Sequence, residues 1–223
     1  DDFGKSAFAD ADTVINFTVS APRYRYSAKQ QLLGPRFFLC DDALNQVRER
    51  RLNQVDIKCD KTNVLIAIGG HDRLSVGPKI AETFLLDIKY TVTLIGHYSS
   101  VKSDKNLLHI TRSNDMASLY DKADLVVSGG GLIKYESAYC GIPNIVLAQT
   151  PEQFAETLEF EAAKLCHIAG SAPTDADLVA QSPAASATLK TASTTISWSP
   201  QELLKTADKA LSSRKKLIQA TKK

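Results

Sequence analysis

The sequence predicts an α/β fold, a Rossmann-like parallel sheet with helices on both faces. Strand-like and helix-like segments alternate from residue 62 to residue 170, and the run at 64–68 is short and wholly apolar. Apolar runs of this length are typical of parallel strands that are buried on both faces. Several runs are followed by glycine, such as Gly69 and Gly96, where the chain turns toward its next segment. Strands and helices that alternate in this way favour a single parallel sheet.

The elements of this sheet are expected in a regular order. Predicted strands cover residues 64–68, 90–95, 106–110, 124–127 and 144–148. Predicted helices carry the apolar stripe of Ile80, Phe84 and Leu85, or cover residues 115–120, 132–140 and 152–165. Asn114 or Asp115 can cap the second of these helices, and Gly141 can end the third.

The segments that flank the sheet are less regular. Before it we expect a strand at 13–17, a turn at Gly34 entering an extended segment up to residue 39, and a charged helix at 41–54. Residues 171–195 are rich in Ala, Ser and Thr, which is typical of a loosely packed insert or linker. A final helix should begin at Ser199 as N-cap, with Pro200 at its first position and Glu202 in a capping box.

The composition is that of an ordinary globular protein, with 43% hydrophobic and 23% charged residues. A formal net charge of +2 gives no support to a nucleic-acid or membrane-surface role. No apolar run approaches the roughly 20 residues of a membrane span, and no secretory leader is recognisable, so we expect a cytoplasmic location. The chain begins at Asp1 without a methionine, as a processed protein or an excised piece would.

The cysteines do not suggest a metal site or disulfides. They form no CxxC pair and show no metal-ligand spacing, and each lies in or beside an apolar run. Such residues are typical of buried thiols in a reducing compartment. We therefore expect no metal and no cofactor.

The most informative segment is SGGGLIKYE, residues 128–136. Three glycines can turn backbone N–H groups toward an anion at the start of a helix, whose dipole favours negative charge there. Glu136 follows about one and a half helical turns later, within reach of a sugar hydroxyl when phosphates lie on the turn. The same pattern also fits a tight strand-to-helix turn followed by a solvated glutamate. The segment alone leaves both interpretations open.

Other polar and glycine residues converge on the same edge of the predicted sheet. In open parallel sheets, ligands bind beyond the carboxyl ends of the strands. The residues expected at that edge are Gly69, Gly70, His71, Asp72, Gly96, Arg112, Ser113, Gly129, Gly130, Gly131 and Gln149. This convergence favours a binding site over a purely structural turn.

His71 is the candidate for proton transfer, because it lies between Gly70 and Asp72 at the predicted ligand edge. A neighbouring acid can fix the tautomer of a histidine or raise its pKa, although a surface-turn histidine fits the sequence equally well. His109 lies inside a strand and is expected to be structural, and His167 is expected to cap the end of a helix. His97 follows a strand and fits either role. The sequence carries no nucleophile elbow and no P-loop lysine.

Five segments, taken in order, point to a known family. They are residues 33–39 (LGPRFFL), 64–72 (VLIAIGGHD), 123–131 (ADLVVSGGG), 135–143 with its YE and GIP, and 145–149 (IVLAQ). In order and spacing they resemble the UDP-sugar hydrolase of pseudaminic acid biosynthesis and its spore-coat polysaccharide relatives. More distantly they resemble the C-terminal, donor-binding half of GT-B glycosyltransferases. The resemblance covers most of residues 10–170 and implies a fold of the GT-B C-terminal-domain type.

The resemblance implies roles for individual residues. Glu136 would hold the ribose hydroxyls of a uridine diphosphate. The glycine turn at 129–131 would approach the diphosphate, opposite a loop of Gly69, Gly70, His71 and Asp72. Backbone around Arg112, Ser113 and Met116 would contact the uracil edge. The donor sugar or the diphosphate would face Gln149 and Gln153.

The chain departs from this family in two ways. Relatives carry Ser, Thr or Arg after the glycines, whereas this chain has Leu132 and Ile133, which leaves backbone amides and Lys134 to meet the phosphates. The resemblance also begins near the end of the family's N-terminal domain, which supplies the catalytic histidine and much of the sugar pocket. The chain therefore looks like half an enzyme, and we expect it to be inactive by itself.

The implied organisation has two parts. Residues 1–60 would be the end of an N-terminal domain with a connecting helix, and residues 61–223 a nucleotide-sugar-binding domain. The expected ligand is a UDP-linked amino sugar, and the expected partner is a preceding domain or a partner chain. The expected function is the binding half of a hydrolase that releases the sugar from UDP. A glycosyltransferase donor domain and a non-catalytic binding module are the alternatives.

Overall fold

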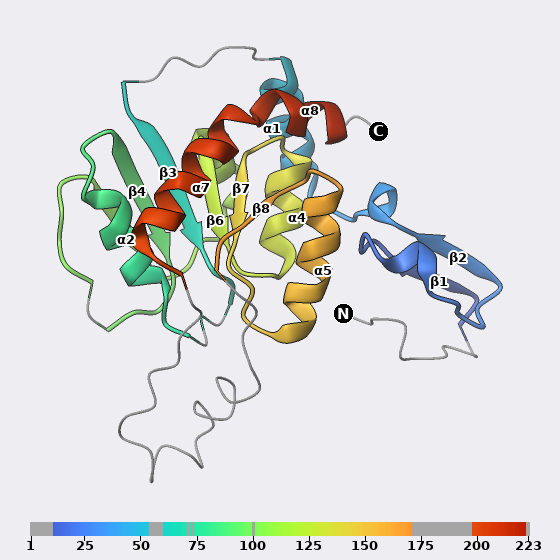
Figure 1. Cartoon of the computed structure of the whole chain (residues 1–223). Helices are drawn as coiled ribbons and strands as arrows, with labels where there is room; N and C mark the ends of the chain where they lie inside the picture. Colours follow the sequence, from blue (N-terminus) through green and yellow to red (C-terminus); the bar gives the residue numbers. More distant parts are fainter. Residues whose placement is uncertain are drawn as a thin grey trace, which may run out of the picture.

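Six parallel strands form the central sheet of the computed structural model, in the order β5-β4-β3-β6-β7-β8 (Figure 1). They are β3 (Thr62–Ala67), β4 (Tyr90–Ile95), β5 (Leu107–Ile110), β6 (Leu125–Ser128), β7 (Asn144–Val146) and β8 (His167–Ile168). The structure describes residues 11–53, 60–70, 72, 74–99, 101–170 and 198–221. This strand order is that of the doubly wound dinucleotide-binding fold, and the parallel α/β sheet agrees with the fold class that the sequence predicted.

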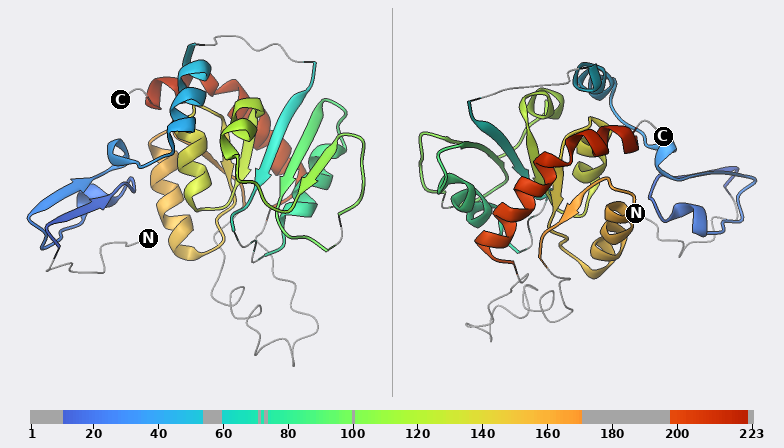
Figure 2. Two further views of the ribbon diagram at one scale, coloured as in Figure 1. Left: turned by 180° about the vertical axis from the view of Figure 1, so that it is seen from behind. Right: turned by 45° about the horizontal axis from the view of Figure 1, so that its top comes forward.

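Helices cover both faces of the sheet (Figure 2). One face packs its inward side chains, among them Ile66, Leu94 and Val127, against α2 (Gly77–Leu85) and α7 (Pro200–Ser212). The other face packs against α1 (Asp42–Asn53), α3 (Met116–Lys122) and the end of α4 (Leu132–Tyr139). Further along, α4 packs with α5 (Pro151–Ala162) and α8 (Arg214–Thr221). Burial on both faces explains the apolar runs at residues 64–67 in β3 and 125–127 in β6.

The helix caps follow the local sequence signals. The Asp115 carboxylate accepts from the Ser118 amide at the start of α3, over 3.0 Å. Ser199 accepts from the Glu202 amide at the start of α7, over 3.1 Å. Each of these bonds satisfies a backbone donor that the first helical turn leaves unpaired.

His167 does not cap a helix, contrary to the expectation from the sequence. Helix α5 already ends at Ala162, and Lys164 follows with a φ of 64°. His167 then begins β8, and its Nε2 lies 2.9 Å from Ser213 Oγ. The apolar residues around it belong to a short strand at the edge of the sheet.

A separate two-stranded parallel sheet lies beside α5 (Figure 1). It consists of β1 (Thr13–Asn16) and β2 (Gln30–Leu33), with the short 3-10 helices η1 (Ala21–Arg23) and η2 (Pro35–Phe37). The sequence predicted β1 but placed an extended segment after Gly34, where the structure has η2. Gly34 has a φ of 103°, and Pro35 begins the 3-10 turn, so the second strand ends before the turn.

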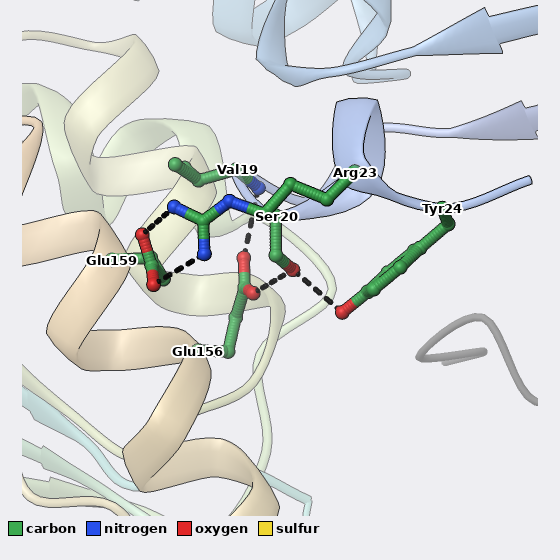
Figure 3. A network of polar contacts seen from close by, with 6 residues as sticks. All are labelled: Val19, Ser20, Arg23, Tyr24, Glu156 and Glu159. Carbon is green, nitrogen blue, oxygen red and sulfur yellow. Dashed lines mark hydrogen bonds and ion pairs between the residues drawn. The ribbon is translucent and has the colours of Figure 1, made fainter.

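The carboxylate of Glu156 anchors this small sheet to α5 (Figure 3). Glu156 is 5% exposed, and its Oε1 accepts from the Val19 amide at 2.8 Å and the Tyr135 hydroxyl at 2.7 Å. Its Oε2 accepts from Ser20 Oγ at 2.5 Å, and Ser20 Oγ lies 2.9 Å from the Tyr24 hydroxyl. A buried carboxylate with three donors is well satisfied and fixes the orientation of the chain that it binds.

An exposed ion pair lies beside this anchor (Figure 3). Arg23 makes two bonds to Glu159, at 2.8 and 2.7 Å. Two-thirds of the Arg23 side chain is solvent-accessible, so water screens the pair. The ion pair orients the segment, while Glu156 supplies the buried contact.

No helix among the described residues is long and apolar enough to cross a membrane. The thiols of Cys140 and Cys166 are buried, Cys40 is half-buried, and all three are free. Cys59 lies outside the described residues. In the same part of the chain, no group of His, Cys, Asp and Glu has the arrangement of a metal site.

Candidate functional site

The candidate site lies where the strand order reverses. The chain runs from β3 outward through β4 to β5, and then crosses back to place β6 on the other side of β3. The ends of the two strands are in register, with Ala67 paired to Ser128. The loops that follow β3 and β6 diverge at this point, and such a switch point is the usual ligand crevice of open parallel sheets.

The glycines of these two loops have different surroundings. A Cβ added at Gly69, Gly70 or Gly131 would meet no atom within 4 Å, and Gly69 has a φ of 136°. A Cβ at Gly129 would lie 2.1 Å from the Ile68 carbonyl oxygen, and one at Gly130 would lie 2.4 Å from Gln153 Cβ. Two glycines therefore tighten the turn, as in the structural interpretation, whereas Gly131 and the opposing pair border open space.

The N-terminus of α4 carries no side-chain cap. Gly131 is the N-cap residue and has extended backbone geometry. The N–H groups of the first turn therefore point away from the helix without a side-chain acceptor from the cap, beside the open space at Gly131. An anion bound there would interact with these N–H groups and with the helix dipole.

Lys134 does not reach the open side of the turn, where the sequence analysis left it as a donor to phosphate. Its side chain is 1% exposed and points into the interior. The ammonium group donates to the Gly130 carbonyl over 2.9 Å and lies 3.4 Å from Thr157 Oγ1. Burial lowers the pKa of Lys134 to about 8. The amine therefore lies on the interior side of the glycine turn and holds its backbone by a hydrogen bond.

Glu136 lies on α4 and is half-buried. Its Oε2 accepts a hydrogen bond from the Tyr120 hydroxyl over 2.5 Å. Tyr120 is fully buried at the end of α3, and burial together with the negative charge of Glu136 raises the pKa of its phenol. Oε1 has no hydrogen-bond partner within the described part of the chain. The sequence does not reveal Tyr120 as the partner of Glu136, because no local pattern links residues 16 positions apart on different helices.

Gln149 and Gln153 hold neighbouring loops together. Gln149 is 4% exposed, and its Oε1 accepts from the Leu74 amide at 3.3 Å. The backbone N–H of Gln149 in turn donates to Gln153 Oε1 at 3.0 Å. These bonds join the loop after β3 to the start of α5. Contact of either side chain with a sugar or a diphosphate stays a prediction. It would require these side chains to share their present hydrogen bonds with the ligand or to give them up.

Asp72 caps α2. Its Oδ2 accepts from the Gly77 amide at 2.7 Å and from the Tyr98 hydroxyl at 2.9 Å. Burial and the Asp72 carboxylate raise the pKa of Tyr98. His71, the candidate for proton transfer, lies outside the described residues. The carboxylate of Asp72 has a structural use that the sequence did not reveal, since Tyr98 is 26 residues away.

Arg112, Ser113 and Met116 lie between β5 and α3. Arg112 is exposed, and Ser113 Oγ accepts from the Asp115 amide at 3.1 Å. Met116 is half-buried against the apolar cluster that contains Tyr120. This segment therefore leads directly into the helix that holds Glu136 in place, at the same end of the sheet as the glycine loops.

No protein family model matches this chain. Among curated proteins it is similar to the spore coat polysaccharide biosynthesis protein SpsG of Bacillus subtilis, with 29% identity over 139 residues, 57% of this chain and 40% of SpsG. It is also similar to the uncharacterized protein MJ1062 of Methanocaldococcus jannaschii, with 28% identity over 165 residues, 64% of this chain and 33% of that protein. The chain spans less than half the length of the curated relatives that it matches.

Among solved structures, the spinosyn rhamnosyltransferase SpnG complexed with thymidine diphosphate resembles the chain with a TM-score of 0.51. The identity is 13%, and the match covers 74% of this chain and 42% of SpnG. A likeness at this level of identity is one of fold. The α/β fold expected from the sequence, a parallel sheet with helices on both faces, is therefore confirmed, and the similarity to SpsG supports the resemblance to spore-coat polysaccharide proteins.

Proposed function

We propose that residues 61–223 bind a nucleotide sugar and form the donor-binding half of an enzyme that acts on a UDP-linked amino sugar. One observation carries this proposal. Two glycine loops flank the β3–β6 switch point, an added Cβ at Gly69, Gly70 or Gly131 would enter open space, and Gly131 is the N-cap of α4 with no side-chain cap. Diphosphate is the chemical group that such an arrangement favours, because backbone amides and a helix dipole converge there.

The proposed roles of the other residues follow from their positions around this point. Glu136 lies on α4 about one and a half helical turns beyond the glycines, and its Oε1 would accept from the ribose hydroxyls. The segment around Arg112, Ser113 and Met116 offers backbone groups to the uracil edge. Gln149 and Gln153 border the glycine turn from the side of α5 and would contact the diphosphate or the donor sugar.

The small N-terminal sheet supports the proposed division of the chain. Parallel sheets are normally buried on both faces. In β1 and β2 the register pairs Ile15 with Leu32 on one face, and Ile15 is 45% exposed. Val14, on the other face, is covered by Tyr26 and Ala28. We infer that this sheet belongs to a larger N-terminal domain and that residues 1–60 form its last part and the connecting helix.

We propose that the whole enzyme releases the sugar from UDP, with water attacking the anomeric carbon. The amides of the glycine turn would stabilise the charge that develops on the leaving diphosphate. A general base and a second wall, which orients the sugar and excludes water, would come from the N-terminal domain, with His71 as the candidate from this half. Transfer to an acceptor hydroxyl is the alternative. The nucleotide-diphosphate-bound rhamnosyltransferase of similar fold makes this alternative worth testing.

Calorimetric titration with UDP tests the shared part of the proposal. We expect UDP to bind the 223-residue chain more tightly than ADP, because the base would be selected by the segment at Arg112. Absence of UDP binding at millimolar concentration would contradict the proposal.

A second experiment tests the reaction. UDP release from a UDP-amino sugar should require the N-terminal domain in the same chain. Release without an acceptor supports the hydrolase, and release only with an acceptor supports the transferase.

A further inference from the structure

We propose that Lys134 is a positioning residue for the diphosphate. Its buried ammonium group holds the Gly130–Gly131 peptide with its N–H toward the phosphate and balances the phosphate charge from behind the turn. This inference rests on the proposed function, since it concerns the same glycine turn. The positive charge that Leu132 and Ile133 do not supply next to the phosphates would thus come from a buried residue.

The orientation follows from one peptide unit. The Lys134 ammonium group donates to the Gly130 carbonyl over 2.9 Å. In a planar trans peptide the carbonyl and the following N–H point in opposite directions, so the Gly131 N–H points away from Lys134. Gly131 is also the position at which an added Cβ would meet no atom within 4 Å. The buried bond therefore directs a backbone donor toward the open side of the turn.

The charge of Lys134 is incompletely balanced in its surroundings. No carboxylate in the described part of the chain lies within ion-pair distance of its ammonium group. Its neighbours are the rings of Tyr135 and Phe160, with centroids at 5.2 and 5.6 Å. The titratable groups that face it are Glu156 on α5 and the Cys166 thiol beside β8.

Neither of these groups forms an ion pair with Lys134, although the nearby Glu156 carboxylate offsets part of the cost of burying the ammonium group. The Glu156 carboxylate already accepts from Val19, Ser20 and Tyr135. Burial raises the pKa of Cys166, so its thiol carries no charge near neutral pH. A bound diphosphate would therefore add negative charge close to this incompletely balanced cation, across a single peptide unit.

The side chains next to the turn explain why such a cation is needed. Leu132 is 54% exposed and Ile133 is half-buried, and neither can donate a hydrogen bond to phosphate. Backbone amides alone would meet a diphosphate with about two negative charges in a UDP-sugar and about three in UDP. Lys134 supplies a full positive charge without an exposed donor.

This arrangement couples nucleotide binding to the protonation of Lys134. Burial lowers the pKa of this amine to about 8 in the free protein, and a bound anion would raise it again. The charge of the terminal phosphate changes little above its own pKa near 6. UDP affinity should therefore be about tenfold lower at pH 9 than at pH 7, because the protonated fraction falls by about that factor.

The test compares wild type with Lys134→Met, which keeps the length of the side chain and removes its charge. UDP and uridine are titrated at pH 7 and pH 9, where uridine controls for titration of the base and for changes in the rest of the site. For Lys134→Met we expect a loss in UDP affinity of about tenfold or more at pH 7, no further loss at pH 9 once uridine is corrected for, and unchanged uridine affinity. Unchanged UDP affinity, or equal losses for UDP and uridine, would overturn the inference.

Two further measurements need only the wild-type chain. Titration with UDP at pH 8, in two buffers of different ionisation enthalpy, should show uptake of about half a proton. No uptake would overturn the inference even if Lys134→Met fails to fold.

Titration with pyrophosphate at pH 7 separates the proposed nucleotide-sugar function from the inference about Lys134. Binding of pyrophosphate but not of UDP would remove the proposed function and retain the phosphate site, whereas binding of neither would remove both.

Discussion

The buried Tyr120 hydroxyl donates a hydrogen bond to Glu136 Oε2 over 2.5 Å and so joins the end of α3 to the middle of α4. Burial raises the pKa of Tyr120, which keeps the phenol a neutral donor throughout the range in which the protein would work. One carboxylate oxygen is therefore fixed by the protein. Under the proposed function, the other oxygen would accept from the ribose in a defined orientation.

We expect Glu136→Ala to weaken UDP binding by about 1.5–3 kcal/mol, roughly tenfold or more, because a charge-assisted pair of hydrogen bonds to ribose is lost. The substitution also leaves the buried Tyr120 hydroxyl without its acceptor, so the free energy of unfolding should fall by about 1–3 kcal/mol. The sequence alone predicted no effect on the fold, since it placed Glu136 on an accessible helix surface. Calorimetry and urea denaturation measure the two effects separately.

Tyr120→Phe is the matched control for this substitution. It removes the donor to Oε2 and leaves the carboxylate in place, so UDP affinity should fall less than in Glu136→Ala. If Glu136→Ala keeps wild-type affinity for UDP, Glu136 does not bind the ribose.

The glycines of the turn provide a second, internally controlled prediction. Gly131→Ala should leave the free energy of unfolding nearly unchanged, because its Cβ would enter open space, yet it should weaken UDP binding by occupying that space. Gly130→Ala should instead destabilise the fold by about 1–3 kcal/mol, because its Cβ would lie 2.4 Å from Gln153 Cβ. Thermal unfolding and UDP titration of both variants test this difference. A Gly131→Ala variant that binds UDP normally would show that the open space is not the ligand site.

Local signals predicted much of the fold. The apolar runs at β3, β4, β6 and β7 identified buried parallel strands, and Asp115 and Ser199 are the caps that their positions indicated. These features depend on a few neighbouring residues. The sequence was therefore sufficient to predict the parallel sheet up to β7 and its glycine loops, but not the edge strand β8.

Features that depend on distant contacts were not predictable. The strand β2 was not predicted, because it begins with Gln30 and Gln31 and is held by pairing with β1 and not by an apolar pattern. Lys134 is polar and follows a glycine turn, so it resembled a phosphate donor. The structure turns it inward because Thr157 and Phe160, on another helix, complete a buried pocket for its ammonium group. The partners of Asp72 and Glu136 were hidden for the same reason.

Glu156→Ala should release the N-terminal sheet from α5. The carboxylate is 5% exposed and accepts from Val19, Ser20 and Tyr135, so its removal leaves buried donors unpaired. We expect a loss of about 2–4 kcal/mol in the free energy of unfolding and faster proteolysis within residues 11–39. Urea denaturation and limited proteolysis with mass spectrometry measure these effects.

Arg23→Ala is the control for the anchor. It breaks the ion pair with Glu159 beside the same segment, but this pair is exposed to solvent and screened by salt. Its effect on both measurements should be clearly smaller than that of Glu156→Ala. Equal effects would show that the buried carboxylate is not the main anchor.

Lys134 should also give the free protein a distinctive dependence of stability on pH. Its pKa in the folded state is lowered to about 8, while the unfolded chain has the ordinary value of 10.5. Between these values the unfolded state binds more protons, so the free energy of unfolding should rise with pH, by up to about 1.4 kcal/mol per pH unit from this residue. UDP affinity should fall over the same range, because the proposed binding is stronger with the charged amine.

Urea denaturation of wild type and Lys134→Met from pH 7 to 9.5 isolates the contribution of Lys134 to the free energy of unfolding, as the difference between the two proteins. A difference that stays constant with pH would mean that Lys134 does not titrate in this range, and the coupling between its protonation and nucleotide binding would then be wrong.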